Sequence, residues 1–379
     1  MGLSRMSEKG PDIVYGLYRE AGRNGSLNLA GEYSSLKAPP ALLNLCIKYL
    51  KQQPQSYAPV EGILSLRKAI AGLVEHWYTS RYDPESEITI TAGATQAIYT
   101  AISAFLNDED EAIIFEPAYE IYAPSVLSCR AHPVYIHLKK PDYRIDWEEV
   151  QKCITSRTKI IIINTPNNPA GSILTAFDME KLQKIVYGTR IIVVSDEVFE
   201  HIVFEGIEHQ SVARFPQLAE RSLIISSFGK SLNITGWKVG YCLAPENLMQ
   251  HFRRKHQFIV QSVNAPVQHA LADYISDPAI FKGIHNTYQE KQRRLIRNLA
   301  PSRLKILPAM GSFFQLLDFS NISDQSDVDF ALYLIKKYKI TLLPLSVYYH
   351  DYAATSQLKC CFARDDEMLD ELSEILIRL

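Results

Sequence analysis

The segment between residues 86 and 243 constrains the fold most strongly, because strand-length apolar runs alternate there with segments of helical period. The runs are nearly continuous in Ile, Val and Phe, which is typical of strands that are buried on both faces of a parallel sheet. The predicted strands span residues 88–91, 111–115, 132–135, 159–163, 191–195, 222–226 and 239–243. The sequence therefore predicts an α/β fold with a mostly parallel central sheet flanked by helices.

Beyond Pro245 the pattern becomes helical to about Leu299, and a mixed region follows, with strands predicted near residues 313–317 and 358–362. A chain of 379 residues exceeds what one compact core usually supports, yet no Ser/Gly-rich or highly charged linker interrupts it. We therefore expect two interlocked lobes. The expected parts are a large domain over residues 45–276, a small α+β domain over residues 277–379, and an N-terminal segment, residues 1–44, that joins the small domain.

The charge and apolar content argue against nucleic acid or a membrane as a partner. The chain is 47% apolar with a formal net charge of −2, so it lacks the basic excess that favours nucleic acid. Its longest apolar runs are strand-length and fall far short of the roughly 20 residues that span a bilayer. The first six residues lack the apolar core of a signal peptide, and Met6 stands where a myristoylation motif has Ser or Thr. Six cysteines without a C-x-x-C pair predict reduced thiols, so we expect a cytoplasmic protein.

A lysine in a loop after a predicted strand is the most informative candidate for chemistry. Lys230 lies in the stretch Ser226-Ser227-Phe228-Gly229-Lys230-Ser231. The end of this stretch is similar to a phosphate-binding P-loop, but that motif needs a glycine where Ile224 stands. A lysine at the end of a strand can instead form a Schiff base, since desolvation and a neighbouring cation lower its pKa and free the amine. Taken alone, Lys230 is more simply explained as an ordinary solvated charge.

Three further stretches lie where ligands gather in open α/β sheets, at the carboxyl ends of strands. Asp196 closes a buried run, where it could cap a helix or hold the proton of a ring nitrogen. Asn164-Thr165-Pro166-Asn167-Asn168-Pro169-Ala170-Gly171 follows another strand and is also consistent with a simple turn. Thr91-Ala92-Gly93-Ala94-Thr95-Gln96-Ala97 begins a helix, which points backbone amides at an anion site. Glu200-His201 has no further ligand at helical spacing, so we predict no metal site.

In their order and spacing these stretches resemble the class I and II aminotransferases of PLP fold type I, and the resemblance covers nearly the whole chain. The sequence is most similar to the methionine and kynurenine/glutamine transaminase branch. The motifs that carry this similarity are Tyr57-Ala58-Pro59-Val60-Glu61-Gly62 with Leu66-Arg67, Glu116-Pro117-Ala118-Tyr119, Asp196-Glu197-Val198 and Cys361-Phe362-Ala363. The resemblance implies pyridoxal 5′-phosphate (PLP) as the cofactor and a homodimer with shared active sites.

The resemblance also implies a role for each matching residue. Lys230 would be the catalytic Schiff-base lysine, and Asp196 would keep the pyridinium nitrogen protonated. Asn168 would hydrogen-bond the phenolic oxygen of PLP and contact the substrate, and Tyr119 would stack on the ring. The cofactor phosphate would be bound by Ala94, Thr95, Ser227 and Lys238, and by Tyr57 from a neighbouring subunit.

Four positions depart from the pattern that the resemblance implies. Phe199 replaces a tyrosine that hydrogen-bonds the phenolic oxygen, so we expect a raised pKa of the Schiff base. Lys238 replaces the commoner arginine at the phosphate. Lys359 stands in place of the arginine fork for the substrate α-carboxylate, and Glu32 in place of a glycine beside it. If Glu32 faces the site, it would repel that carboxylate or pair with Lys359; a one-residue shift that places Gly31 there, or an outward-facing Glu32, is the alternative.

The resemblance implies transfer of an amino group from methionine, an aromatic amino acid, glutamine or kynurenine to a 2-oxo acid. An altered carboxylate pocket leaves open β-elimination or oxidation of an amino acid by the same cofactor. A PLP-binding module without catalysis is a third hypothesis, against which Lys230, Asp196 and Asn168 together argue.

Overall fold

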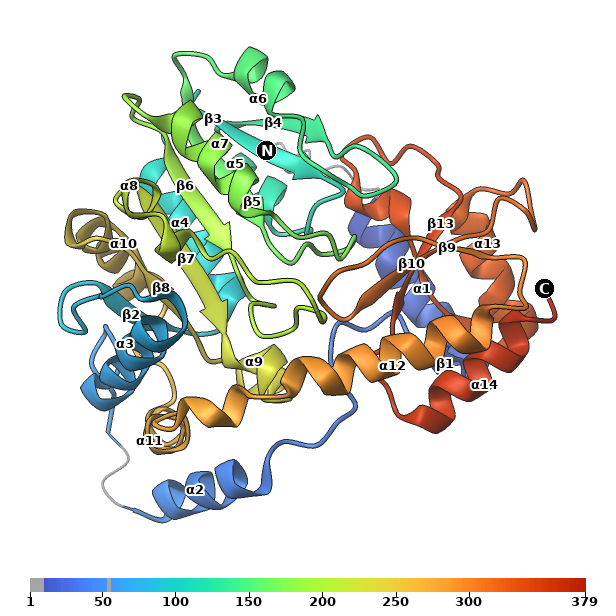
Figure 1. Cartoon of the computed structure of the whole chain (residues 1–379), viewed down its shortest axis with the longest axis horizontal. Helices are drawn as coiled ribbons and strands as arrows, with labels where there is room; N and C mark the ends of the chain where they lie inside the picture. The colour runs from blue at the N-terminus through green and yellow to red at the C-terminus, as the bar shows by residue number, and fades with distance from the viewer. Residues whose placement is uncertain (1–9, 53–55) are drawn as a thin grey trace, which may run out of the picture.

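The computed structural model describes residues 10–52 and 56–379 and shows a large part built on one sheet with a smaller part beside it (Figure 1). The expectation about a leader segment concerns residues 1–6, which lie outside the described residues. In the part of the chain that the structure describes, no helix is both long enough and apolar enough to cross a bilayer.

A seven-stranded sheet forms the centre of the large part, in the order β2-β8-β7-β6-β5-β3-β4. Each strand overlaps one that the sequence predicted, and outside β4 most of their residues are buried, as continuous apolar runs require. The strands are β2 (Ile88–Thr91), β3 (Glu111–Glu116), β4 (His132–His137), β5 (Thr158–Asn164), β6 (Ile192–Asp196), β7 (Ser222–Ser227) and β8 (Gly240–Leu243). The α/β prediction is confirmed.

Strand β8 is the exception to a fully parallel sheet. It pairs antiparallel with both of its neighbours, Ile88 of β2 lying opposite Leu243 and Ser227 of β7 opposite Gly240. After β7 the chain makes the short helix α9 (Phe228–Ser231) and the 3₁₀ turn η2 (Thr235–Trp237), and it then re-enters the sheet. This connection lacks the long crossover helix that a parallel return needs, so the strand runs backwards. The apolar content of β8 carries no information on its direction.

Alternate residues of the sheet pack into two separate apolar layers. On β5, Ile160 and Ile162 face one layer while Ile161 and Ile163 face the other, because successive side chains of a strand point to opposite faces. The first layer is completed by helices α4 (Ala94–Phe105), α5 (Tyr122–Ser128) and α10 (Glu246–Ile259). The second is covered by helices that include α3 (Leu64–Tyr78), α6 (Trp147–Cys153), α7 (Ala176–Val186) and α8 (Pro216–Ala219), with the 3₁₀ turn η1 (Val212–Arg214).

The smaller part contains a four-stranded antiparallel sheet in the order β12-β13-β10-β9. Strands β10 (Phe314–Asp318) and β13 (Gln357–Cys361) agree with the two predicted there, and β9 (Lys305–Ile306) and β12 (Leu343–Pro344) are short additions. Its helices are α12 (Ile284–Leu299), α13 (Asp327–Tyr333), the π-helical turn η4 (Leu334–Tyr338), the 3₁₀ turn η5 (Leu345–Tyr348) and α14 (Asp366–Leu376).

The N-terminal segment lies against this smaller part, although the two are far apart in the sequence (Figure 1). Strand β1 (Leu27–Asn28) pairs in parallel with β11 (Ile340–Thr341), and helix α1 (Gly10–Asn24) packs beside α13. This pairing brings residues 29–33 to the boundary between the two parts, where the site described below is formed. Helices α2 (Pro40–Lys51), α11 (Ala265–Tyr274) and the 3₁₀ turn η3 (Pro278–Phe281) complete the chain, and α2 packs on α11.

Candidate active site

One cavity of about 210 Å³ gathers all but two of the residues that the sequence proposed for the site. It opens where β5, β6 and β7 end, the edge of the sheet at which ligands bind in open α/β folds. The proposed residues that line it are Glu32, Ala94, Thr95, Tyr119, Asn168, Asp196, Phe199, Ser227, Lys230 and Lys238. Of the other two, Lys359 contacts this group through Glu32, and Tyr57 lies on the surface with 79% of its area exposed.

The amine of Lys230 projects into this cavity from α9, the short helix that follows β7. Its Nζ donates a hydrogen bond to the backbone carbonyl oxygen of Glu32, and it lies 5.7 and 5.8 Å from the ring centroids of Phe199 and Phe313. Burial lowers the pKa of Lys230 despite the charge of Glu32, which opposes the shift. A lysine in these surroundings has a larger neutral fraction, which is what a nucleophile or a base requires.

Asp196 ends β6 and is buried, with 4% of its area exposed. Its Oδ2 accepts a hydrogen bond of 2.6 Å from the Tyr122 hydroxyl, and its Oδ1 accepts one of 3.3 Å from the backbone N–H of Val198. Burial raises the pKa of Asp196 to about 6, although both hydrogen bonds and the charge of Lys230 act in the other direction. A buried carboxylate of this kind gains from pairing with a cationic ligand group.

An anion cradle lies where β2 passes into α4. Gly93 has a φ of 80°, and a Cβ added there would lie 3.1 Å from the Nζ of Lys238. A Cβ on Gly240 would lie 3.0 Å from the backbone nitrogen of Ala94, so both glycines are needed for the close approach. The ammonium of Lys238 and the free amides of the first helical turn thus converge, an arrangement that attracts a phosphate. Thr95 adds its hydroxyl, 3.3 Å from that of Tyr119.

Asn168 lies between the two parts of the molecule. Its backbone N–H donates to Asn164 Oδ1 at 2.7 Å, and its Nδ2 donates to Glu32 Oε1 at 3.1 Å. The Oδ1 of Asn168 is buried without a hydrogen-bond partner in the structure. A buried acceptor of this kind costs free energy unless a ligand satisfies it, so this side chain is suited to contact one.

The sequence left open whether Glu32 faces the site. In the structure its carboxylate faces the cavity. Its Oε1 accepts a hydrogen bond of 2.5 Å from Lys359 Nζ and one of 3.3 Å from the Tyr348 hydroxyl. Lys359 is fully buried, and its Nζ lies 4.2 and 4.7 Å from the ring centroids of Phe314 and Tyr348. Burial acts to raise the pKa of Glu32, but the charges of Lys359 and Lys230 outweigh it and lower the pKa to about 2. The alternative of an outward-facing Glu32 is therefore wrong, and Gly31 is not among the residues that line the cavity.

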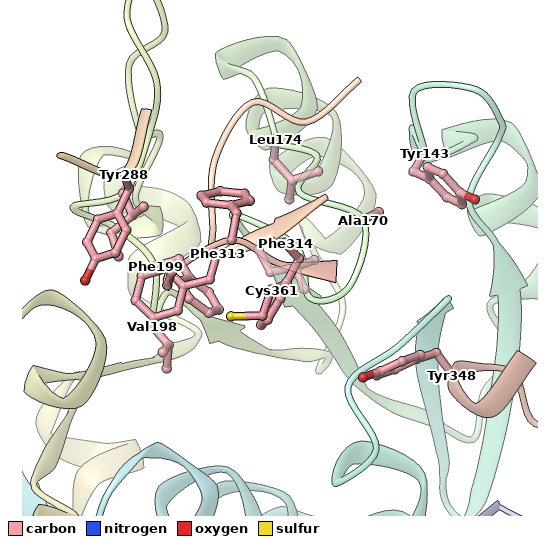
Figure 2. Packing of buried hydrophobic residues seen from close by; sticks show 14 of the residues in the cluster. Tyr143, Ala170, Leu174, Val198, Phe199, Tyr288, Phe313, Phe314, Tyr348 and Cys361 are labelled. Atoms are coloured by element: carbon pink, nitrogen blue, oxygen red, sulfur yellow. The ribbon is translucent and has the colours of Figure 1, made fainter. Parts of the chain in front are cut away.

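Phe199 belongs to an aromatic cluster on the small-domain side of the cavity. Its ring packs edge to face on Phe313 and Phe314, with centroids 5.2 and 5.6 Å apart (Figure 2). The same residue lines the cavity, so its side chain contacts both the core and the site.

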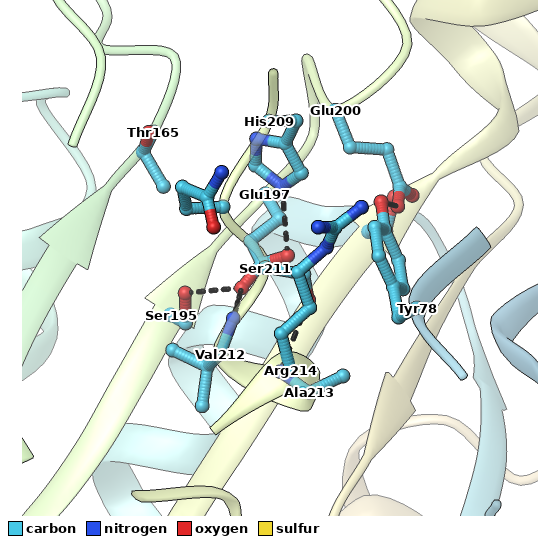
Figure 3. A network of polar contacts seen from close by, with 12 residues as sticks. Tyr78, Thr165, Ser195, Glu197, Glu200, His209, Ser211, Val212, Ala213 and Arg214 are labelled. Atoms are coloured by element: carbon cyan, nitrogen blue, oxygen red, sulfur yellow. Dashed lines mark hydrogen bonds and ion pairs between the residues drawn. The ribbon is translucent and has the colours of Figure 1, made fainter. Parts of the chain in front are cut away.

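Sequence reasoning missed the residues that hold the site in place. Tyr122 and Tyr348 contact Asp196 and Glu32, but neither stands in a motif with an obvious signal. Glu200, which was weighed as a metal ligand, instead accepts hydrogen bonds from the hydroxyls of Tyr78, Ser226 and Tyr241. Figure 3 shows Tyr78 with Glu200 beside the buried pair Glu197 and His209.

A second missed group lies next to the Glu116-Pro117-Ala118-Tyr119 motif. Glu116, His137 and His350 bring ligand atoms within 4.8 Å of one another, and among the described residues this is the one group with that geometry. Glu116 Oε2 lies 2.8 Å from His350 Nδ1, and Glu116 Oε1 accepts the backbone N–H of His350 at 2.7 Å. These bonds fasten the segment that carries Tyr348 to the end of β3.

Comparisons with known proteins agree with this geometry. Residues 29–376 match the aminotransferase class I and II family. A methionine aminotransferase from Escherichia coli strain K12 is 37% identical over 99% of this chain and 98% of its own length. A kynurenine–oxoglutarate transaminase from Dictyostelium discoideum is 28% identical over 98% of this chain and 95% of its own.

The solved structures give the same result for the fold. A methionine aminotransferase from Escherichia coli, 37% identical, superposes with a TM-score of 0.95 over 100% of both chains. An N-succinyldiaminopimelate aminotransferase from Mycobacterium tuberculosis, 28% identical, also has a TM-score of 0.95 over 100% of both. This chain therefore belongs to the class I and II aminotransferase family, and it is a PLP-dependent transferase of fold type I.

Proposed function

We propose that Lys230 carries PLP and that the enzyme moves an amino group from an amino acid to a 2-oxo acid. The observation that carries this proposal is the meeting of a buried amine, Lys230, and a buried carboxylate, Asp196, at the ends of neighbouring strands in one cavity. One group can attack an aldehyde and move protons, and the other can hold the proton of a ring nitrogen.

The residues present fit the cofactor. The anion cradle at Gly93, Ala94 and Lys238 suits the phosphate, and the unpartnered Oδ1 of Asn168 supports a contact with a polar ligand group. Asp196 would pair with the pyridinium nitrogen, which would relieve the desolvation that raises its pKa. Tyr119 and Phe199 would border the ring. We propose these roles, with Thr95 and Ser227 as further phosphate contacts, as the sequence implied.

When bound, PLP supplies an aldehyde for a Schiff base and a ring that accepts an electron pair. The amine of Lys230, once displaced by the substrate, is the base that takes the proton from the carbon bearing the amino group. Asp196 keeps a proton on the ring nitrogen, and the surrounding aromatic side chains exclude water. The same lysine thus acts first as a nucleophile and then as a base and an acid.

Methionine is the first donor to test and kynurenine the second, because the chain is similar to a methionine aminotransferase and to a kynurenine–oxoglutarate transaminase. Purified enzyme with PLP is mixed with L-methionine alone, and loss of the Schiff-base absorption is followed. Addition of a 2-oxo acid should restore that absorption and yield a new amino acid. Release of ammonia or a thiol without any acceptor would instead indicate β-elimination, and consumption of oxygen would indicate oxidation. The relatives' names favour transamination over both.

Replacing Phe199 by tyrosine should lower the pKa of the Schiff base by about one unit, the scale of one hydrogen bond to a charged form. The new hydroxyl would donate to the phenolic oxygen of PLP, a bond that phenylalanine cannot make. The measurement is a titration of the absorption spectrum with pH. Phe199→Leu is the control, since it adds no donor and should leave the pKa near that of the wild type. Equal pKa values for all three proteins would contradict a position beside the phenolic oxygen.

We further propose a homodimer in which Tyr57 reaches the phosphate site of a neighbouring subunit. Supporting this, helix α2 presents an apolar stripe to solvent, with Leu43, Ile47 and Leu50 between 40% and 55% exposed, just before the 79% exposed Tyr57. Such a stripe is costly unless it is covered. Ile47→Asp should yield monomers with weaker PLP binding, measured by light scattering and cofactor titration. Ile296→Asp, at an exposed position on α12, should stay dimeric, and a monomeric wild type would end the proposal.

The domain limits and the location in the cell also remain proposals. The pairing of β1 with β11 supports residues 1–44 joining the small domain, with the large domain at 45–276 and the small one at 277–379. All six cysteines are free, four of them buried, which supports a reducing compartment such as the cytoplasm.

A further inference from the structure

The carboxylate of Glu32 accepts several hydrogen bonds inside the cavity. Three donors from three separate segments meet at its Oε1: Lys359 Nζ at 2.5 Å, Asn168 Nδ2 at 3.1 Å and the Tyr348 hydroxyl at 3.3 Å. Charge-assisted hydrogen bonds of this kind are what a protein uses to bind a carboxylate. Here the carboxylate that they bind belongs to the chain itself.

This arrangement changes the charge that an incoming substrate meets. Lys359 is fully buried, and Glu32 neutralises it, so the pair presents no net positive charge. A substrate carboxylate that approaches Lys359 must displace Glu32 or lie against it, and placing two like charges together is costly. A second carboxylate, Glu120, lies close enough to this pair for the charge of Glu32 to add to the effect of burial in raising its pKa.

A donor without a carboxylate avoids this cost altogether. Its amine can reach Lys230 while the Glu32–Lys359 pair stays closed, and its substituent meets a cavity wall that contains the ring of Tyr119. Opening a buried ion pair leaves both partners in need of new ones, so leaving it closed is favourable.

We infer that this enzyme also accepts primary amines that carry no carboxylate on the amino-bearing carbon, and that Glu32 is the residue that determines this specificity. The inference rests on the proposed transaminase function. In the exchange, the carbon–nitrogen bond of the amine is broken and its carbon leaves as an aldehyde after hydrolysis. The nitrogen is then bonded to the carbonyl carbon of a 2-oxo acid, which loses its oxygen as water. The amine carbon is oxidised by two electrons and the keto carbon is reduced by two, so no other oxidant is required.

In the acceptor half of the reaction, the Glu32–Lys359 ion pair must open. A 2-oxo acid carries a carboxylate, so Lys359 must exchange Glu32 for the acceptor at that stage. Glu32 therefore acts as a displaceable internal carboxylate, and its removal should help every carboxylate-bearing ligand.

The test uses holoenzyme and donors matched in their side chains: L-methionine with 3-(methylthio)propylamine, and L-phenylalanine with 2-phenylethylamine. The rate of each donor half-reaction is followed by the Schiff-base absorption after rapid mixing. The wild type should react with both members of each pair. Glu32→Gln keeps the shape of the side chain and removes its charge, so it should shift the ratio of rates toward the amino acid by about tenfold or more. Glu120→Gln leaves the Glu32–Lys359 pair in place and should shift the ratio much less.

A binding measurement gives a readout that does not depend on turnover. Calorimetry of holoenzyme with 3-phenylpropionate should show binding that is about tenfold tighter or more in Glu32→Gln than in the wild type. The neutral 3-phenylpropanol should bind both proteins alike. Lys359→Arg, combined with Glu32→Gln, should strengthen the carboxylate preference further through a bidentate fork.

Two results would overturn the inference while the proposed function stands: L-methionine reacts but neither amine does, or Glu32→Gln leaves both the rate ratio and carboxylate binding unchanged. If no donor of either kind reacts, the proposed function itself fails and the inference with it. Should Glu32→Gln fail to fold, the comparison of amines with amino acids in the wild type decides the matter alone.

Discussion

Replacement of Lys230 by alanine should reduce the rate of transamination by roughly 10⁴-fold or more, because one substitution removes both the nucleophile and the general base. The variant should still bind PLP, since the anion cradle at Gly93 and Lys238 and the carboxylate of Asp196 are left intact. Its spectrum should be that of the free aldehyde, without the band of a Schiff base. Steady-state rates and absorption spectra are the measurements.

The matched control is Lys184→Ala, which removes an exposed lysine from α7 and should change neither property. A normal Schiff-base spectrum in Lys230→Ala would show that another amine carries the cofactor. Loss of PLP binding together with loss of fold, seen by circular dichroism, would point to a structural role instead. Partial rescue of Lys230→Ala by added small primary amines would support its role as the base.

Asp196→Asn should have two opposite effects, a large loss of activity and a gain in stability of the PLP-free protein. Activity should fall roughly 10³-fold, the scale of losing one preorganised electrostatic partner, because asparagine does not hold a proton on the ring nitrogen. Asp196→Glu, which restores the charge on a longer side chain, should recover part of the rate. Activity of Asp196→Asn near that of the wild type would contradict the proposed ring contact.

The gain in stability follows from the raised pKa of Asp196. Burial raises this pKa from 3.8 to about 6, so the ionised form is disfavoured in the folded state, by about 3 kcal/mol when it is fully charged. This penalty is absent below about pH 4, where the group is protonated in both states, and it is complete above about pH 6. Asparagine carries no charge and so has no such penalty, while its Oδ1 can still accept a hydrogen bond from the Tyr122 hydroxyl. Urea unfolding of PLP-free protein should therefore show Asp196→Asn more stable at pH 8 and equal to the wild type near pH 4.

A stability difference that is the same at pH 4 and pH 8 would show that ionisation of Asp196 is not its source. If the prediction holds, the wild type keeps a destabilising charge in its core for the sake of the cofactor. Binding of PLP should then stabilise the wild type more than it stabilises Asp196→Asn, because the pyridinium partner relieves a cost that the variant lacks. Thermal unfolding with and without PLP measures this difference.

The sequence alone was sufficient for the central sheet and for most of the cavity. Continuous apolar runs such as residues 159–163 are removed from water only when both faces of the strand are covered. Local composition is therefore enough to predict that they are buried in a parallel sheet. The same logic placed Asp196, Asn168 and Lys230 together, since polar residues that follow buried strands collect at one edge. The apolar pattern of a strand and the residues that follow it are short-range properties, so they can be identified in the sequence alone.

Only the tertiary structure decided the direction of β8 and the side on which Glu32 lies. Both depend on contacts between segments that are distant in sequence: Gly240 pairs with Ser227 after a short return, and Glu32 meets Lys359 across more than 300 residues because β1 pairs with β11. A glutamate in an exposed loop and one buried against a lysine have the same local sequence, and the free energy that separates them comes from desolvation and a distant opposite charge. That energy exists only once the chain has folded.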